Sequence, residues 1–262
     1  MSRSNGQGGT AVLERGAERS SRPDRTSGRR RSRRGRRVRR FFRENGLSVA
    51  AFCLFLVCLV GQVLAGFRDH NANQREHGQP TIGIVEYVGS GHFAEATFEN
   101  WESEFLQMAA FVILTIMLRQ KGSPESKDFL GDEEVDEDPR EARRSAQRLA
   151  KAPWPVRRGG VALALYEHSL SLALLLLFAA SFALHALGGV AEYNEEQLTH
   201  GGAAISTLAY LGTARFWFES FQNWQSEFLS VGVLFVLTVW LRERGSPQSK
   251  PVAAPHSETG AA

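Results

Sequence analysis

The sequence has little cysteine and no cysteine–histidine spacing typical of a zinc site. Two cysteines in 262 residues exclude a disulfide-stabilised scaffold. The phosphate-binding pattern Gly-x-x-x-x-Gly-Lys-Ser/Thr is also missing, and no motif of an enzyme class is present. We therefore expect no cofactor, no metal ion and no enzymatic activity.

Large apolar residues are nearly absent from the beginning of the chain, which is instead dense in arginine. The first 43 residues hold 15 of the 31 Lys and Arg residues, all of them Arg. Such a segment cannot bury enough surface to offset chain entropy, so residues 1–40 are expected to form a disordered tail. Nucleic acid binding is not favoured, because an apolar segment follows directly. We expect contact with anionic phospholipid through Arg36, Arg37, Arg39, Arg40 and Arg43.

The chain repeats itself without a gap at a distance of 123 residues. Residues 44–127 (copy one) align with residues 167–250 (copy two), with 32 identities in 84 positions. The identities cluster in the motif Phe-x-Asn-Trp-x-Ser-Glu-Phe-Leu and in the motif Gly-Ser-Pro-x-Ser-Lys. We interpret the match as an internal duplication. Each Gly-Ser-Pro is expected to end a helix, with the serine capping a following one.

Each copy contains two segments suited to a membrane helix. The first lies at residues 47–67 in copy one and at 170–190 in copy two. The second lies at 99–118 and at 222–241, where about 20 residues suffice to span the hydrocarbon core. A basic region before residue 47 is also typical of a signal peptide. The counterpart segment is internal, however, so we expect both to be retained as spans.

The basic residues predict an orientation. If four spans place both termini on one side, that side holds 28 of the 31 Lys and Arg residues. The positive-inside rule then assigns both termini to the cytoplasm, with the chain in the inner or plasma membrane. The expected fold class is all-α: a multi-pass membrane protein of four transmembrane helices, built as two tandem parallel two-helix repeats.

The domain organisation follows from these assignments. A charged, solvated and partly helical linker is expected between the repeats. The loops on the other side, residues 68–97 and 191–220, are expected either as amphipathic interfacial helices with aromatics at headgroup level or as loosely ordered loops. The expected boundaries are a tail at 1–40, repeat one at 41–127, the linker at 128–158, repeat two at 159–250 and a disordered tail at 251–262.

Polar residues recur at one depth of the expected helices. Glu104 lies about 21 Å and Gln62 about 22 Å from the cytoplasmic boundary, and Glu227 and His185 occupy the same depths in copy two. Such groups are costly in hydrocarbon, so we expect Gln62 and Glu104, and likewise His185 and Glu227, to pair with each other or to turn into a common central cavity. The layer has three open interpretations: a structural clamp, a permeation or proton site, and a catalytic carboxylate. The candidate polar layer comprises Gln62, Asn100, Glu104, His185, Asn223 and Glu227.

Other conspicuous side chains receive simpler interpretations. Trp101 and Trp224 are expected to anchor the helices at the membrane interface. His77 and His200 occupy matching exposed positions, and with one neighbouring glutamate each they offer too few ligands for a metal.

The motif Phe-x-Asn-Trp-x-Ser-Glu-Phe-Leu, the entry Arg-Phe-Phe-Arg-Glu-Asn-Gly-Leu-Ser at 40–48 and the exit Gly-Ser-Pro-x-Ser-Lys carry a resemblance. On these motifs, residues 41–250 resemble a family of bacterial predicted integral membrane proteins known as a domain of unknown function. Copy two departs from the entry pattern, with His168-Ser169 in place of Asn45-Gly46. The resemblance implies a membrane location and supplies no activity, substrate or site residue.

The sequence therefore predicts a non-enzymatic integral membrane protein that acts as a structural or partner-binding component. The alternative is a small-solute or proton-coupled transporter that uses Glu104 and Glu227. The expected partner is the lipid bilayer, and homo-oligomerisation is left open.

Overall fold

The computed structural model describes residues 37–129 and 133–260, and within them the regular structure is entirely helical. These residues divide into two units within helix α2 (Gly46–Glu76), the first ending at Gln62 and the second beginning at Val63. Most of the expected disordered tail, including Arg36, lies outside the described residues.

The first unit consists of a basic helical segment and the first half of α2. Residues 37–44 are helical, so the expected tail boundary at residue 40 falls within a helix. The arginines of this segment are exposed, and Arg40 forms an ion pair with Glu44 at 2.6 Å. The apolar residues of α2 that follow are not buried by protein.

The four expected helices are all present, and each extends beyond its apolar core. Two of them, α2 and α8, are long and apolar enough to cross a membrane. All four continue by two to three turns past the end that was expected to face away from the cytoplasm. The bounds are α2 Gly46–Glu76, α4 Gly91–Met117, α8 Ser169–Thr199 and α10 Ala214–Trp240.

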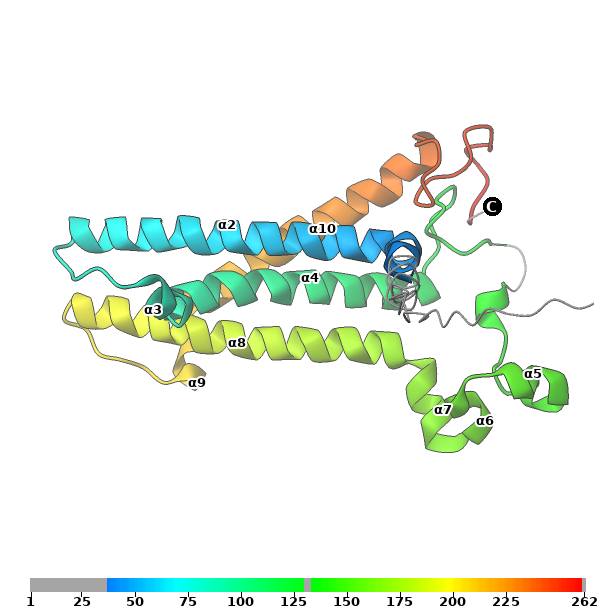
Figure 1. Cartoon of the computed structure of the whole chain (residues 1–262), viewed down its shortest axis with the longest axis horizontal. Coiled ribbons are helices and arrows are strands. Elements are labelled where there is room, and N and C mark those ends of the chain that lie inside the picture. The colour runs from blue at the N-terminus through cyan, green and yellow to red at the C-terminus, as the bar shows by residue number, and fades with distance from the viewer. Residues whose placement is uncertain (1–36, 130–132, 261–262) are drawn as a thin grey trace, which may run out of the picture. The chain divides into compact units, whose positions relative to one another are not determined.

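In the second unit, α4 packs along α8, and α10 packs on α4 (Figure 1). The backbones of α4 and α8 approach closely where each helix carries a glycine. A Cβ atom on Gly188 would lie 2.5 Å from the backbone nitrogen of Glu95, and one on Gly91 would lie 2.5 Å from the backbone nitrogen of Glu192. Glycine at these positions thus sets the separation of the two helices.

The segments expected as interfacial helices or loose loops have a different structure. Two short helices, α3 (Ile84–Val88) and α9 (Thr207–Tyr210), follow the extended ends of α2 and α8. Their tyrosines, Tyr87 and Tyr210, are buried by protein. A Cβ atom on Gly189 would lie 2.5 Å from the Tyr210 hydroxyl, so glycine makes room for the buried ring.

An asparagine clamp fixes each short helix to the preceding long one. The Asn71 side chain accepts from Ile82 N at 2.8 Å and donates to Ile82 O at 3.0 Å. Asn194 makes the same two bonds with Ile205, at the same distances. The two clamps are 123 residues apart, as in the sequence alignment.

The Gly-Ser-Pro-x-Ser-Lys motifs form matching turns. Gly122 and Gly245 adopt φ values of 84° and 87°, which favour glycine. The second serine accepts a bond from the backbone at 2.9 Å, Gln120 N for Ser126 and Glu243 N for Ser249. The helix stop is therefore present, but the serines stabilise the turn itself, since no helix begins there in the described chain.

The linker and the C-terminal segment are more structured than a solvated chain. The linker contains two 3-10 turns and short helices, and residues 251–260, expected as a disordered tail, are placed in turns. The buried Lys250 ammonium donates to three backbone carbonyls of this tail, at Pro255, His256 and Glu258. The linker elements are η1 Glu134–Asp136, η2 Glu141–Arg144, α5 Ala146–Lys151, α6 Trp154–Arg158 and α7 Gly160–Glu167.

Candidate functional site

Acidic and basic side chains gather where α4, α8, α9 and α10 meet in the second unit. On α4 the glutamates stand at positions i, i+4 and i+7, which place them on one face of the helix. On α8, His185 and Glu192 are seven residues apart and share one face of the helix. Arg215 and Glu219, four residues apart, share one face of α10. We call this set the acidic cluster; it comprises Glu95, Glu99, Glu102, His185, Glu192, Tyr210, Arg215 and Glu219.

His185 is the buried basic group of the acidic cluster. Its side chain is 0 % exposed, and its ring stacks on Phe216 with centroids 4.8 Å apart. Its Nδ1 lies 2.8 Å from Glu102 Oε2, in a hydrogen bond. Its Nε2 has no hydrogen-bond partner and faces Glu219 Oε2 at 3.6 Å, beyond normal hydrogen-bond length.

Glu102 connects three helices. Its side chain is 0 % exposed, and its second oxygen accepts a bond from Trp224 Nε1 at 2.9 Å. Trp224 stands on α10, Glu102 on α4 and His185 on α8. Trp224, expected as an interfacial anchor, therefore serves as a hydrogen-bond donor to a buried carboxylate.

Glu219 is held by both of its oxygens. Oε1 accepts from Arg215 Nε at 2.9 Å, and Oε2 accepts from the Tyr210 hydroxyl at 3.0 Å. Arg215 also donates to Glu196 at 2.5 Å, and the Tyr210 hydroxyl lies 3.2 Å from Glu95 Oε1. A hydroxyl has one proton, so it cannot donate to both carboxylates at once.

The two carboxylates around Tyr210 differ in acidity. Burial and the neighbouring Glu219 charge raise the pKa of Glu95 to about 7, against the opposing effect of Arg215. Burial also acts to raise the pKa of Glu219, but its contacts with His185, Arg215 and Tyr210 outweigh burial and lower that pKa overall. Glu219 is thus the carboxylate that keeps its negative charge.

The acidic cluster has more acidic than basic groups. Five glutamates face one arginine and one histidine among its members. Carboxylates that are withdrawn from water need a partner charge, a proton or a bound cation. The cluster is therefore chemically suited to hold a cation.

Three members converge closely enough to share one ion. One ligand atom each from Glu99, His185 and Glu219 lies within 4.8 Å of the others. These residues come from α4, α8 and α10, so only the folded bundle brings them together.

A polar cavity of about 170 Å³ lies between the ends of α2 and α8. Glu196, which pairs with Arg215, and Glu192 of the acidic cluster line its α8 side. The lining is rich in imidazole, amide and carboxylate groups: His70, Asn73, Gln74, His77, Gln79, Glu192, Glu195, Glu196, Thr199 and His200.

The expected pairing within the polar layer is only partly tested. His185 pairs with Glu102, so its expected pairing with Glu227 is wrong. Glu104 is exposed and Glu227 half-buried, and the two are near enough for their charges to repel. Gln62 ends the first unit, and its pairing with Glu104 stays a prediction.

The remaining candidates mostly satisfy backbone groups. Asn100 donates to Ala96 O at 2.7 Å, and Asn223 donates to Glu219 O at 3.2 Å. Trp101 packs edge-to-face on Phe98, with ring centroids 5.3 Å apart.

The two outer histidines also contact the backbone of their own helices. His77 Nδ1 lies 2.9 Å from Asn73 O, and His200 Nδ1 lies 2.8 Å from Glu196 O. The contacts are equivalent in the two copies, and both histidines line the polar cavity.

Sequence reasoning missed most of the acidic cluster because it followed residues that are identical in the two copies. The charged members of the cluster instead occupy positions where the copies differ. His185 corresponds to Gln62, Glu219 to Ala96, and Glu95 to Phe218. Glu99 and Glu102 correspond to Gln222 and Gln225. A comparison of charge between the copies would have identified these residues.

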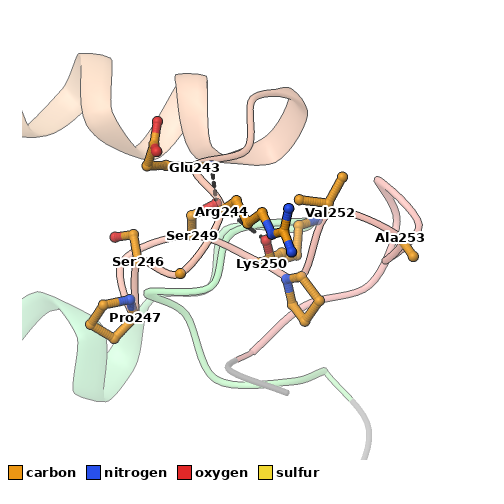
Figure 2. A pocket seen from close by; sticks show the side chains of 10 residues that line it. Glu243, Arg244, Ser246, Pro247, Ser249, Lys250, Val252 and Ala253 are labelled. Carbon is orange, nitrogen blue, oxygen red and sulfur yellow. Dashed lines mark hydrogen bonds between the residues drawn. The ribbon is translucent and has the colours of Figure 1, made fainter.

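A larger hollow, of about 790 Å³, lies at the C-terminal turn and is less suited to a ligand (Figure 2). One continuous segment, residues 243–253, lines it. Ser246 and Ser249 accept hydrogen bonds from the backbone of the turn, and the ammonium of Lys250 donates hydrogen bonds to three backbone carbonyls. The other charged side chains that line it, Glu243 and Arg244, are exposed to solvent and opposite in sign.

A family model described as "Domain of unknown function (DUF6766)" matches residues 38–261. No curated protein and no solved structure matches the chain.

Proposed function

We propose that this chain, which belongs to the family described as a domain of unknown function (DUF6766), is a multi-pass integral membrane protein that carries small cations through the acidic cluster. The acidic cluster carries the proposal, because three of its glutamates, Glu99, Glu102 and Glu219, lie close to the buried His185, whose Nε2 has no hydrogen-bond partner. A purely structural network is expected to pair its buried groups, whereas a binding site leaves some for its ligand.

The membrane part of the proposal rests on exposed apolar surface. Besides α2 and α8, the last turns of α4 and α10 present exposed large apolar residues, among them Met117, Leu237 and Trp240. Their number would be costly in water and is natural in lipid. We therefore assign spans to 47–67, 99–118, 170–190 and 222–241, with both termini in the cytoplasm. The exposed arginines of residues 37–44 are assigned to anionic headgroups of the same leaflet.

This arrangement places the acidic cluster toward the non-cytoplasmic side. The polar cavity between the ends of α2 and α8 opens on that side and offers carboxylates and imidazoles to an incoming cation. Arg215 and Glu196 form the ion pair between the cavity and the cluster. We assign the cavity as the entrance and the cluster as the binding site behind it.

Flux through purified protein tests the proposal. The full chain is reconstituted into liposomes that contain either a fluorescent divalent-cation indicator or a pH indicator. We expect cation entry with the wild-type chain and at least a tenfold slower rate with Glu219→Gln. Glu227→Gln, which changes a carboxylate on the same helix outside the cluster, should leave the rate unchanged. Equal rates for all three proteins and empty liposomes would refute the carrier.

A second candidate, a structural membrane component, is favoured by one observation. The chain of bonds from Trp224 through Glu102 to His185 ties α10, α4 and α8 together. If this were the whole role, Glu102→Leu would lower thermal stability, and neither wild type nor variant would carry cations.

A further inference from the structure

We infer that Glu99, His185 and Glu219 form a binding site for a single divalent transition-metal ion of the Zn²⁺ type. The inference rests on the proposed function and names the class of cation. It draws on two observations: the convergence of three ligand atoms within 4.8 Å, and the Nε2 of the fully buried His185, which makes no hydrogen bond and faces Glu219 Oε2 at 3.6 Å.

The orientation of His185 is that of a metal ligand. Metal-binding histidines commonly donate one ring N–H to a carboxylate, which fixes the tautomer and leaves the other nitrogen free to coordinate. Here Nδ1 contacts Glu102 at 2.8 Å, and Nε2 makes no hydrogen bond and faces Glu219 Oε2 at 3.6 Å. The Trp224 N–H fixes Glu102 in turn, at 2.9 Å, so the imidazole is held through two hydrogen bonds.

The distance across the site agrees with a bound ion. His185 Nε2 and Glu219 Oε2 lie 3.6 Å apart. Two ligands at 2.0–2.1 Å from a tetrahedral Zn²⁺ are separated by about 3.4 Å. The observed gap is too long for a good hydrogen bond and close to the separation that a shared ion requires.

Glu219 can bind an ion without losing its present partners. Arg215 occupies Oε1, and the Tyr210 hydroxyl uses one lone pair of Oε2. A carboxylate oxygen has two lone pairs, so Oε2 retains one for the metal. Hydrogen-bonded carboxylate ligands of this kind are typical of metal sites.

The donor set selects the class of ion. One imidazole nitrogen with two carboxylate oxygens suits Zn²⁺, Mn²⁺, Fe²⁺ or Co²⁺, whereas Mg²⁺ and Ca²⁺ prefer oxygen alone. Three protein ligands leave a fourth position open. An open position allows an ion to be received and released, as a carrier requires.

The duplication supplies matched variants. His185→Gln introduces the residue that copy one has at the equivalent position, Gln62. Glu99→Gln likewise introduces the residue of copy two, Gln222. The equivalent helix of the other copy carries glutamine at each of these positions, so the substitutions test ligation more than folding.

Spectroscopic titration with Co²⁺ tests the site. The full chain in detergent is titrated with Co²⁺, whose visible absorption reports the coordination number, and Zn²⁺ is then added as competitor. We expect one Co²⁺ per chain, a four- or five-coordinate spectrum and full displacement by Zn²⁺. His185→Gln, Glu99→Gln and Glu219→Gln should abolish the spectrum, while Glu227→Gln should retain it.

Glu102 has a different expected effect, because it acts through His185. Glu102→Gln should weaken Co²⁺ binding about 10–100-fold without changing the number of ions bound. Thermal melting of each variant without metal shows whether it is folded. If His185→Gln does not fold, Glu99→Gln, at a half-buried position, decides the question.

The outcomes separate this inference from the proposed function. Absence of stoichiometric Co²⁺ binding, or binding that survives His185→Gln and Glu219→Gln, would overturn the metal site. If the chain bound no Co²⁺ but carried protons in a manner that required Glu219, the metal site would be overturned and the proposed carrier function would be upheld. Co²⁺ binding with the expected variant pattern but no cation flux would uphold the site and overturn the carrier.

Discussion

Substitution of Gly188 by alanine should separate α4 from α8 and loosen the acidic cluster. The added Cβ would lie 2.5 Å from the backbone nitrogen of Glu95 and 2.8 Å from the Cβ of Ala94. Both atoms are fixed to the backbone of α4, so neither can give way unless that helix moves. Ordinary van der Waals contact begins at 3.4 Å, so the helices must separate locally by up to 0.9 Å, the difference between 3.4 and 2.5 Å.

The separation reaches the site because His185 lies one turn from Gly188 on α8. The contact of its Nδ1 with Glu102, now 2.8 Å, would stretch toward 3.7 Å (2.8 Å plus 0.9 Å), beyond hydrogen-bond range. Overpacking typically costs about 1–3 kcal/mol, and the better helix propensity of alanine returns roughly 1 kcal/mol. Together with the weakened bond, we expect a net loss on the order of 1–3 kcal/mol.

Thermal melting in detergent measures this effect, with Gly232→Ala as the control. A Cβ atom on Gly232, within α10, would meet nothing within 4 Å. That variant should melt at or slightly above the wild-type temperature, because alanine favours a helix over glycine by about 1 kcal/mol. Gly188→Ala should melt several degrees lower. Equal melting of Gly188→Ala and wild type would refute the close approach of the two helices.

Three further predictions follow from the buried charges and from the topology. The pKa of Glu95, raised from 4.5 to about 7, means that the folded chain holds this proton more tightly than the unfolded chain. That part of the stability should be complete below about pH 4.5 and be lost as the pH rises toward 7; Glu95→Gln should flatten this decline in a melting series. Glu102→Leu should cost about 2–4 kcal/mol by leaving two donors unpaired, whereas Glu104→Leu, at an exposed position, should melt like wild type; the reverse order would contradict the assigned burial. An alkaline phosphatase fusion after residue 250 should be inactive, and an active fusion would contradict the cytoplasmic C-terminus.

The sequence predicted the helices well because apolar length is a local property. Their far ends were missed because hydropathy detects apolar residues, while the turns at those ends carry polar residues, several of them buried, among them His70, Glu95 and Ser220. Helix α4 begins at Gly91, where Ser90 Oγ accepts a bond from Phe93 N at 3.2 Å, although its apolar segment begins at residue 99. Thr213 caps α10 through Phe216 N in the same way, at 3.3 Å.

The site was harder to predict, and His185 shows why. The sequence gives its position along the helix, but such a position does not say which neighbour the ring faces. Glu102 and Glu104 are two residues apart and point to nearly opposite sides of α4, so an error of two positions exchanges a buried partner for an exposed carboxylate. The emphasis on repeated residues added to the error, because the charged positions of the cluster are not repeated.

The melting temperature of the full chain with and without Zn²⁺ tests the central claim most directly. A ligand that binds only the folded state stabilises it, by about 2.7 kcal/mol at a concentration 100-fold above its Kd. The account predicts that Zn²⁺ raises the melting temperature of wild type and of Glu227→Gln and leaves that of Glu219→Gln unchanged. An equal increase in all three proteins, or none in wild type, would contradict a cation site in the acidic cluster.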